Sequence, residues 1–139
     1  MRSKIIILSI HPSHIVKILS GEKLFEYRKM VPQNIDYIII YATAPIKKVV
    51  AIVEVDMIIK DTPQNIWNLT QNKSGVSYEF FMAYFTEVSI GYAIKFRNIY
   101  RLSAPVNIAV IDGVKCAPQA YQYVDKSISD LCKELNVNM

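Results

Sequence analysis

Residues 19–28 hold the densest group of charged side chains that could take part in catalysis or ligand binding. A helical pattern ends in this stretch, and an extended segment begins. Glu26 and Arg28 are two residues apart, so a strand would place both on the same face. Lys23 comes just before them, close to Gly21, where the backbone is free to turn. Burying such charges is costly unless they pair or meet a ligand. We therefore expect the functional site at this junction.

Lys23, Glu26 and Arg28 are open to two interpretations. Lys23 would serve as a general base if desolvation lowered its pKa toward neutrality, whereas a nearby Glu26 carboxylate would oppose this by stabilising the ammonium. Arg28 offers a planar fork that suits a phosphate or the edge of a base. In the alternative, these charges form an ordinary surface ion pair worth about 0–1 kcal/mol, and Arg28 only holds Glu26 in place.

One histidine and two tyrosines are further candidates for ligand contacts. His11 lies at the same junction and is a candidate ligand contact, whereas His14 is expected to be exposed. Tyr41 and Tyr121 would stack on an unpaired base or serve as packing residues. The histidines lack supporting cysteines or carboxylates, and no motif predicts a metal or a cofactor.

A basic stripe occupies one face of a later predicted strand, with Lys95, Arg97 and Arg101 at alternating positions. These cations either contact phosphates or pair with Glu54 and Asp56 across neighbouring strands, each pair contributing roughly 0.2–1 kcal/mol. We favour the pairing and keep Lys95 and Arg97 as candidate phosphate contacts.

Apolar periodicity predicts the elements that position these side chains. We expect strands at residues 5–10, 23–28, 37–42, 48–60 and 90–102, and a closing strand at 106–111. Helices are expected from Pro12 to Gly21, after Thr62, after Ser77 and after Ser127. Strict alternation would bury five residues in one barrel core: Val49, Val53, Val55, Ile94 and Phe96. A helical stripe of four aromatic residues is also assigned to the core rather than to a ligand site: Phe80, Phe81, Tyr84 and Phe85.

Composition sets the class of protein. The 139 residues fit one domain, and 52% hydrophobic residues are enough for a core. The apolar runs are too short to cross a membrane, and the first residues lack a signal-peptide pattern. Cys116 and Cys132 are expected to be reduced thiols, typical of a cytoplasmic protein. A net charge of +4 permits an anionic partner without requiring one.

Short strands with inserted helices and no βαβ rhythm predict an α+β fold. We expect a partly closed, mixed β-barrel of five to six strands decorated by short helices. Residues 1–139 would form a single domain, with 112–139 as a C-terminal helical extension.

Several motifs resemble the ASCH domain family of the PUA-like superfamily. The most specific is Gly-x-Lys-x-x-Glu-x-Arg at residues 21–28, which overlaps Leu19-Ser-Gly-Glu-Lys23 and Glu26-Tyr-Arg28. Three others support it: Ser9-Ile-His-Pro12, Ile40-Tyr-Ala-Thr-Ala-Pro45 and Gly91-Tyr-Ala-Ile94. Pro118-Gln119-Ala-Tyr121 also resembles a tail near the cleft of some members. The resemblance implies a barrel whose cleft, lined by residues 23–28 and approached by Gln119, receives RNA or a nucleoside.

Some proteins of this family are acetylcytidine amidohydrolases, which use a lysine corresponding to Lys23 and a threonine three residues later. Here Glu26 occupies the threonine position, and their catalytic glutamate has no clear counterpart in 61–77. We therefore expect a module that binds RNA or a modified nucleoside. The alternative is a small hydrolase of acylated nucleosides, or a ribonuclease, with Lys23 as base and Glu26 in the catalytic set. A protein-interaction adaptor with a vestigial cleft is a third, weaker interpretation.

Overall fold

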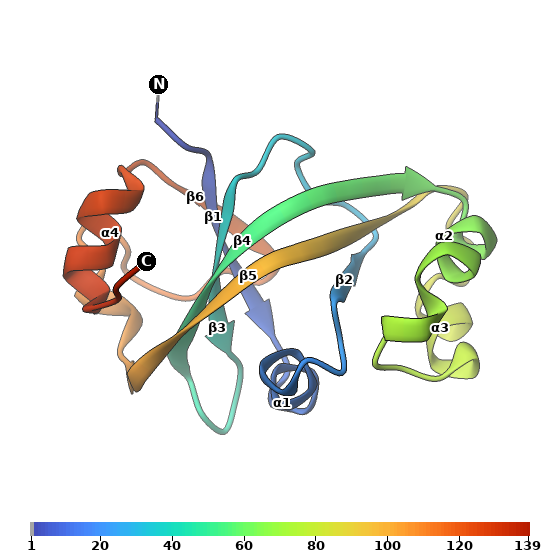
Figure 1. The fold of residues 1–139 in the computed structure, drawn as a ribbon, viewed down its shortest axis with the longest axis horizontal. Helices are drawn as coiled ribbons and strands as arrows, with labels where there is room; N and C mark the ends of the chain where they lie inside the picture. Colours follow the sequence, from blue (N-terminus) through green and yellow to red (C-terminus); the bar gives the residue numbers. More distant parts are fainter. Residues whose placement is uncertain (1) are drawn as a thin grey trace.

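The computed structural model describes residues 2–139, which form a six-stranded mixed sheet with four short helices (Figure 1). The strands are β1 (Ile5–Ile10), β2 (Phe25–Arg28), β3 (Tyr37–Ala42), β4 (Lys48–Asp61), β5 (Gly91–Val106) and β6 (Tyr121–Val124). The helices are α1 (Pro12–Ser20), α2 (Pro63–Thr70), α3 (Tyr78–Tyr84) and α4 (Ile128–Leu135). Two 3-10 turns, η1 (Gln71–Lys73) and η2 (Ile108–Val110), complete the chain.

The sheet has the order β2-β5-β4-β3-β1-β6, in which only β1 and β3 run parallel. The long strands β4 and β5 form a curved ribbon along the molecule (Figure 1). Because β2 and β6 are the two edges of this order, the curled sheet stays open between them. The expected α+β fold, a partly closed mixed barrel decorated by helices, is confirmed.

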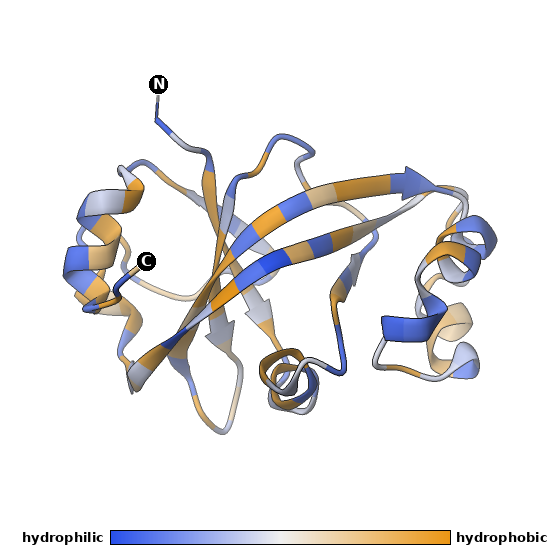
Figure 2. Cartoon of the chain, in the orientation of Figure 1, coloured by the Kyte–Doolittle hydropathy of each residue, from blue (hydrophilic) through white to orange (hydrophobic). Residues whose placement is uncertain are grey.

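Bulges interrupt the expected alternation along β4. The register shifts between Val49 and Ala51, and again around Val55. The extra residue turns Val49 to the opposite face, because side chains alternate with a period of two. Val53, Val55, Ile94 and Phe96 do share one core, but the prediction for Val49 was wrong, since it lies in a second core on the other face. Figure 2 shows hydrophilic residues interrupting the apolar ones along both strands.

Helix α1 connects β1 to β2 and sets the position of the candidate site. His11 caps its first turn, and Pro12 occupies a position where no amide hydrogen is needed. Gly21 ends the helix in the left-handed region, with φ of 87°. Ile15 and Ile18 pack the helix against the core that contains Val53 and Phe96. The strand that follows begins at Phe25 rather than at Lys23, so Lys23 belongs to the connection.

The C-terminal part of the chain differs from the prediction. The expected strand at 106–111 is wrong, since β5 continues to Val106 and η2 follows it. The sheet is completed instead by β6, which pairs antiparallel with β1. Residues 112–139 are therefore more than a helical extension. They supply an edge strand as well as α4, whose first turn is capped by Ser127.

Helices cover three separate apolar cores. The first core lies under α1, the second under α4, and the third joins α2 and α3 to the ends of β2 and β5. Figure 1 accordingly shows α4 at one end of the molecule and α2 with α3 at the other. Among residues 2–139, no helix is long and apolar enough to cross a membrane. Cys116 and Cys132 are both free.

Candidate functional site

A cavity of about 200 Å³ lies between the end of β1, the start of α1, strand β2 and residues 76–84. Its charged lining residues are Lys23, Glu26 and Arg28. Both histidines and an aromatic wall complete it: His11, His14, Tyr27, Phe80, Phe81 and Tyr84. The structure thus brings the charged residues of the 23–28 segment and His11 around one cavity, which we call the pocket.

Arg28 orients the only carboxylate of the pocket lining. Its Nε and Nη2 lie 3.1 and 3.0 Å from Oε2 of Glu26, and Nη2 also donates to the Ser9 carbonyl at 2.7 Å. Glu26 is 7% exposed, and its Oε1 has no hydrogen-bond partner among residues 2–139. The ion pair therefore fixes the side chain while leaving one carboxylate oxygen available.

Ser9 extends this network toward the C-terminal segment. Its hydroxyl donates to the Pro118 carbonyl at 2.7 Å, just ahead of Gln119 and β6. Arg28 and Ser9 together therefore join β2, β1 and the segment before β6 across the open side of the barrel.

Lys23 is buried to an unusual degree, with 1% of its surface exposed. Its ammonium donates to the Ser74 carbonyl at 2.8 Å and lies 4.7 Å from the centre of the Tyr27 ring. Burial lowers the pKa of Lys23 to about 8, because desolvation penalises the charged form more than the Glu26 carboxylate stabilises it. Such a lysine is charged in most molecules at neutral pH and neutral in a small fraction.

The loop of residues 73–75 is held in place by three donors from residues 17–24. Each of its consecutive carbonyls accepts one hydrogen bond: Lys73 from the Leu24 amide (2.9 Å), Ser74 from Lys23 Nζ (2.8 Å) and Gly75 from Lys17 Nζ (2.9 Å). A Cβ at Gly75 would come within 2.6 Å of the Lys23 side chain, and the residue has φ of +70°. Only glycine fits this close approach. Lys23 therefore has a structural role in addition to lining the pocket.

The two histidines differ in surroundings. His11 Nδ1 accepts from the Ser13 amide at 3.1 Å as part of the helix cap, so its ring proton resides on Nε2. His14 is half-buried against the Phe80 ring, 5.6 Å away, so the expectation that it is exposed was wrong. Burial lowers the pKa of His14, which favours the neutral ring at pH 7. Residues 2–139 contain no cluster of histidine, cysteine and carboxylate side chains suited to a metal.

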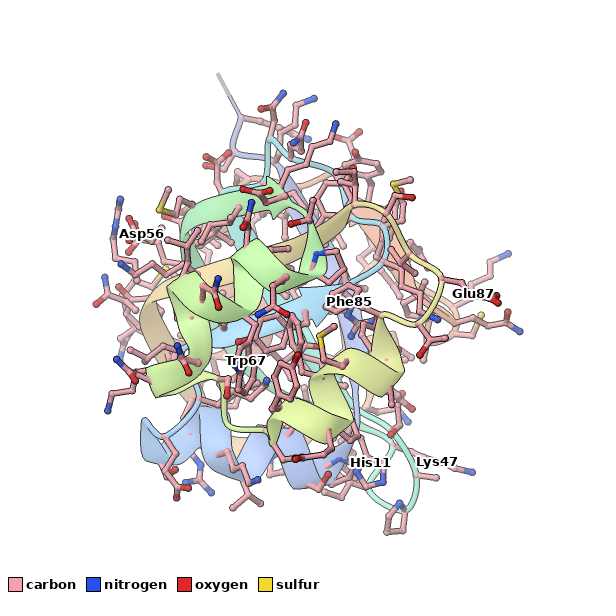
Figure 3. All side chains as sticks on the ribbon, turned by 90° about the vertical axis from the view of Figure 1, so that its right-hand side faces the viewer. His11, Lys47, Asp56, Trp67, Phe85 and Glu87 are labelled. Atoms are coloured by element: carbon pink, nitrogen blue, oxygen red, sulfur yellow. The ribbon has the colours of Figure 1, made fainter. Side chains whose placement is uncertain are left out.

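The aromatic stripe of α3 divides between the core and the pocket. Phe81 and Phe85 are buried as expected, and their edge-to-face contacts continue to Tyr27. Phe80, by contrast, is 51% exposed and lines the pocket together with Tyr84. Figure 3 views this end of the molecule, with Phe85 labelled among the side chains of α2 and α3. The periodicity identified the helix but gave no sign that three of these four aromatic residues line a cavity.

The other candidate residues lie outside the pocket. Tyr41 packs against the second core, and Gln119 is exposed without lining the pocket. Tyr121 lines a neighbouring cavity. Lys95 faces Asp56 at 3.6 Å, and Arg97 reaches the same carboxylate at 2.9 Å.

The basic stripe on β5 thus forms ion pairs, as we favoured from the sequence. Arg97 also lies 3.8 Å from Glu54, and its hydrogen bond holds the pKa of Asp56 below the usual range. Arg101 departs from the expectation, since it forms no ion pair among residues 2–139. Lys95 is opposite Phe25 in the β2–β5 register, whereas Glu26 is opposite Ile94. Alternation therefore places the stripe on the sheet face away from Glu26.

Replacing Lys95 and Arg97 together by glutamine should leave the salt dependence of oligonucleotide binding unchanged, because these charges are already neutralised by carboxylates. The measurement is the slope of log Kd against log salt concentration, in which each single-strand phosphate contact contributes about 0.7. A slope reduced by one contact or more would assign the stripe to the ligand instead.

Comparison with protein-family models finds no match, and comparison with curated proteins finds none either. Solved structures do match along nearly the whole chain. A mutant of an ASCH protein from Zymomonas mobilis has a TM-score of 0.82 at 23% identity, covering 98% of both chains. A second mutant has a TM-score of 0.81 at 21% identity, covering 97% of this chain and 99% of the other. The ASCH structure from the same organism that is not described as a mutant gives 0.80 at 21% identity, covering 98% and 97%.

These similarities concern the backbone, since fewer than a quarter of the aligned residues are identical. They agree with the six-stranded half-barrel. The chain therefore has the fold of the ASCH proteins, as its motifs predicted.

Proposed function

We propose that the pocket binds a single nucleobase, presented by RNA or by a modified nucleoside. The observation that carries this proposal is Oε1 of Glu26, an unpaired oxygen of a residue that is 7% exposed and lines a cavity walled by aromatic rings. A carboxylate in such surroundings has a strong preference for an N–H partner, because leaving it unpaired costs desolvation energy. The amino groups and ring N–H groups of bases supply such partners.

Hydrogen-bond donors line the same pocket as this acceptor. The Lys23 ammonium has N–H groups beyond the one used by Ser74, and His11 carries its ring proton on Nε2. An acceptor and donors in one pocket match the edge of a base in which an N–H or amino group neighbours an acceptor, which is a carbonyl in guanine and uracil and ring nitrogen N3 in cytosine. The rings of Phe80 and Tyr84 provide faces for stacking.

The size of the pocket supports a small ligand. Its volume of about 200 Å³ is below the roughly 300–1,000 Å³ typical of drug-sized ligands. It accommodates one ring system rather than a duplex. The net charge of +4 is compatible with a ligand that carries phosphates outside the pocket.

Replacing Glu26 by glutamine tests the proposal, because the variant keeps the size of the side chain and removes its charge. Hydrogen bonds to charged groups contribute about 1.5–3 kcal/mol, so nucleoside affinity should fall at least about tenfold. Isothermal titration with the four common ribonucleosides and acetylcytidine measures the effect. Glu54→Gln is the matched control, since Glu54 pairs with Arg97 on the other sheet face and should leave affinity unchanged.

Thermal unfolding of both variants shows whether the fold is intact, because Arg28 loses its ion pair in Glu26→Gln. A folded Glu26→Gln variant with unchanged affinity, or a wild-type protein that binds none of these nucleosides or RNA, would contradict the proposal.

One observation favours a second function, hydrolysis of an acylated nucleoside or of RNA. With a pKa of about 8, Lys23 is neutral in roughly a tenth of molecules at pH 7 and could accept a proton there. The nucleophile would be water, because the Ser9 hydroxyl already donates to the Pro118 carbonyl. In addition, Glu26 stands where the acetylcytidine amidohydrolases have a threonine. Glu26 Oε1 would then hold that water. Binding remains the first proposal, since it needs no reactive group beyond those whose hydrogen bonds are described above.

A further inference from the structure

A second cavity of about 200 Å³ opens next to the pocket. Arg28 and Tyr84 line both cavities, so the two are neighbours separated by these side chains. The remaining wall comes from the residues after β2 and from the start of β6, among them Lys29, Met30 and Tyr121. We call it the edge cavity.

The edge cavity occupies the open side of the barrel. Strands β2 and β6 are the two edges of the sheet, and their residues meet in this cavity without pairing. The bonds from Arg28 to Ser9 and from Ser9 to Pro118 link β2 through β1 to the segment before β6. The cavity is therefore a built part of the half-barrel and continues from the pocket along its opening.

The chemistry of the edge cavity differs from that of the pocket. Its lining contains two cations, Arg28 and Lys29, and no carboxylate. Lys29 Nζ lies 5.2 Å from the centre of the Tyr84 ring, close to the boundary between the cavities. Tyr121 is partly buried, which leaves part of its ring accessible in the cavity. Cations at a boundary between two sites with aromatic rings suit a phosphate that links two bases.

We propose that the edge cavity is a second base subsite, so that the ligand is a single-stranded oligonucleotide rather than a free nucleoside. One base enters the pocket, its neighbour stacks on Tyr121, and Arg28 and Lys29 bind the phosphate between them. This inference rests on the proposed function of the pocket and specifies the class of its ligand.

The test compares the affinities of a nucleoside and of a dinucleoside monophosphate with the same base, measured by isothermal titration in the ribose and deoxyribose series. Wild type should bind the dinucleotide at least tenfold more tightly than the nucleoside. Tyr121→Ala should weaken dinucleotide binding about five- to 150-fold, the range for loss of one stacked base, and should leave nucleoside binding unchanged. Tyr121→Phe should retain dinucleotide affinity, because it keeps the ring.

Lys29→Gln is a second variant that does not disturb packing, since Lys29 is exposed. It should lower dinucleotide affinity and leave nucleoside affinity unchanged. Lys60→Gln is its matched control, because Lys60 is also exposed and lines neither cavity. Comparing the two sugar series shows whether RNA, DNA or both are accepted.

The outcomes separate this inference from the function of the pocket. If the nucleoside binds in a Glu26-dependent way but the dinucleotide binds no more tightly, the edge cavity is not a subsite and the pocket proposal stands. Equal losses for both ligands in folded Tyr121→Ala would also overturn the subsite. If neither ligand binds to wild type, both proposals fail.

Discussion

Replacing Phe96 by alanine is expected to lower the free energy of unfolding by about 3–5 kcal/mol, the range for truncating a buried aromatic side chain. Phe96 is 6% exposed and belongs to the core that includes Ile15 and Ile18 of α1. Its amide also donates to the Leu24 carbonyl at 3.0 Å, next to Lys23. The side chain thus fills the core beneath the helix and the strand connection that carry the pocket.

Urea unfolding followed by circular dichroism measures this loss, with the slope m checked for constancy between wild type and variant. Met57→Ala on the paired strand is the control. Met57 is 51% exposed, and truncations at exposed positions usually change stability by less than about 0.5 kcal/mol. A Phe96→Ala variant that loses less than about 1 kcal/mol would show that the core is not packed in this register.

The positions of the main elements could be predicted because each has a local signal. Pro12 and Gly21 mark the two ends of α1, and the isoleucine-rich run of β1 indicates a strand buried on both faces. Glu26 and Arg28 are two residues apart, so a strand places them side by side, and the structure joins them in an ion pair. These features depend only on residues close in sequence.

Features that depend on distant neighbours could not be predicted in the same way. Residues 49–53 are all apolar, so nothing local reveals the bulge that turns Val49 to the second core. Strand β6 has only four residues and follows a loop, which makes it too short for a periodic signal. It is defined by its pairing with β1, more than a hundred residues earlier.

The pocket shows the same division between local and distant determinants. Lys23, Glu26 and Arg28 were identifiable because charge in a short segment is visible in the sequence. Phe80 and Tyr84 were assigned to the core, since a helical stripe of aromatic residues looks the same whether it meets a strand or a cavity. Whether these rings meet a strand or a cavity is decided by the placement of α3 beside β2. The loop of residues 73–75, which Lys17 and Lys23 hold by hydrogen bonds, leads into this helix.

Lys23 is the residue whose replacement best separates binding from catalysis, and Lys23→Met is the sharpest variant. Methionine keeps an unbranched stem in the space next to Gly75 and removes the ammonium. If the protein is a binding module, neither wild type nor Lys23→Met forms a product. The binding free energy for the nucleoside then weakens by about 1–3 kcal/mol in the variant, because a charged donor is lost. If it is a hydrolase, turnover falls roughly 100-fold or more, as expected for loss of a general base.

Two measurements distinguish these results. Incubation of wild type with acetylcytidine and short RNAs, followed by mass spectrometry, detects any product. Lys17→Met is the matched control, because Lys17 holds the adjacent Gly75 carbonyl but does not line the pocket. An effect shared by both variants would come from the clamped loop. An effect confined to Lys23→Met would come from the ammonium in the pocket.

The pH dependence of stability tests the buried state of Lys23 without any ligand. Because burial lowers its pKa from 10.5 to about 8, the unfolded chain holds a proton between these values that the folded chain has released. Folded stability attributable to Lys23 must therefore increase with pH in this window, by about 1.5 kcal/mol between pH 8 and 9.5. Subtracting the Lys23→Met curve from the wild-type curve isolates this contribution, and a flat difference would mean that the ammonium is solvated.

If catalysis exists, its rate should rise over the same titration, since only the neutral amine accepts a proton. A rise in the stability difference without product formation would instead identify Lys23 as a buried donor that serves the clamped loop and the ligand.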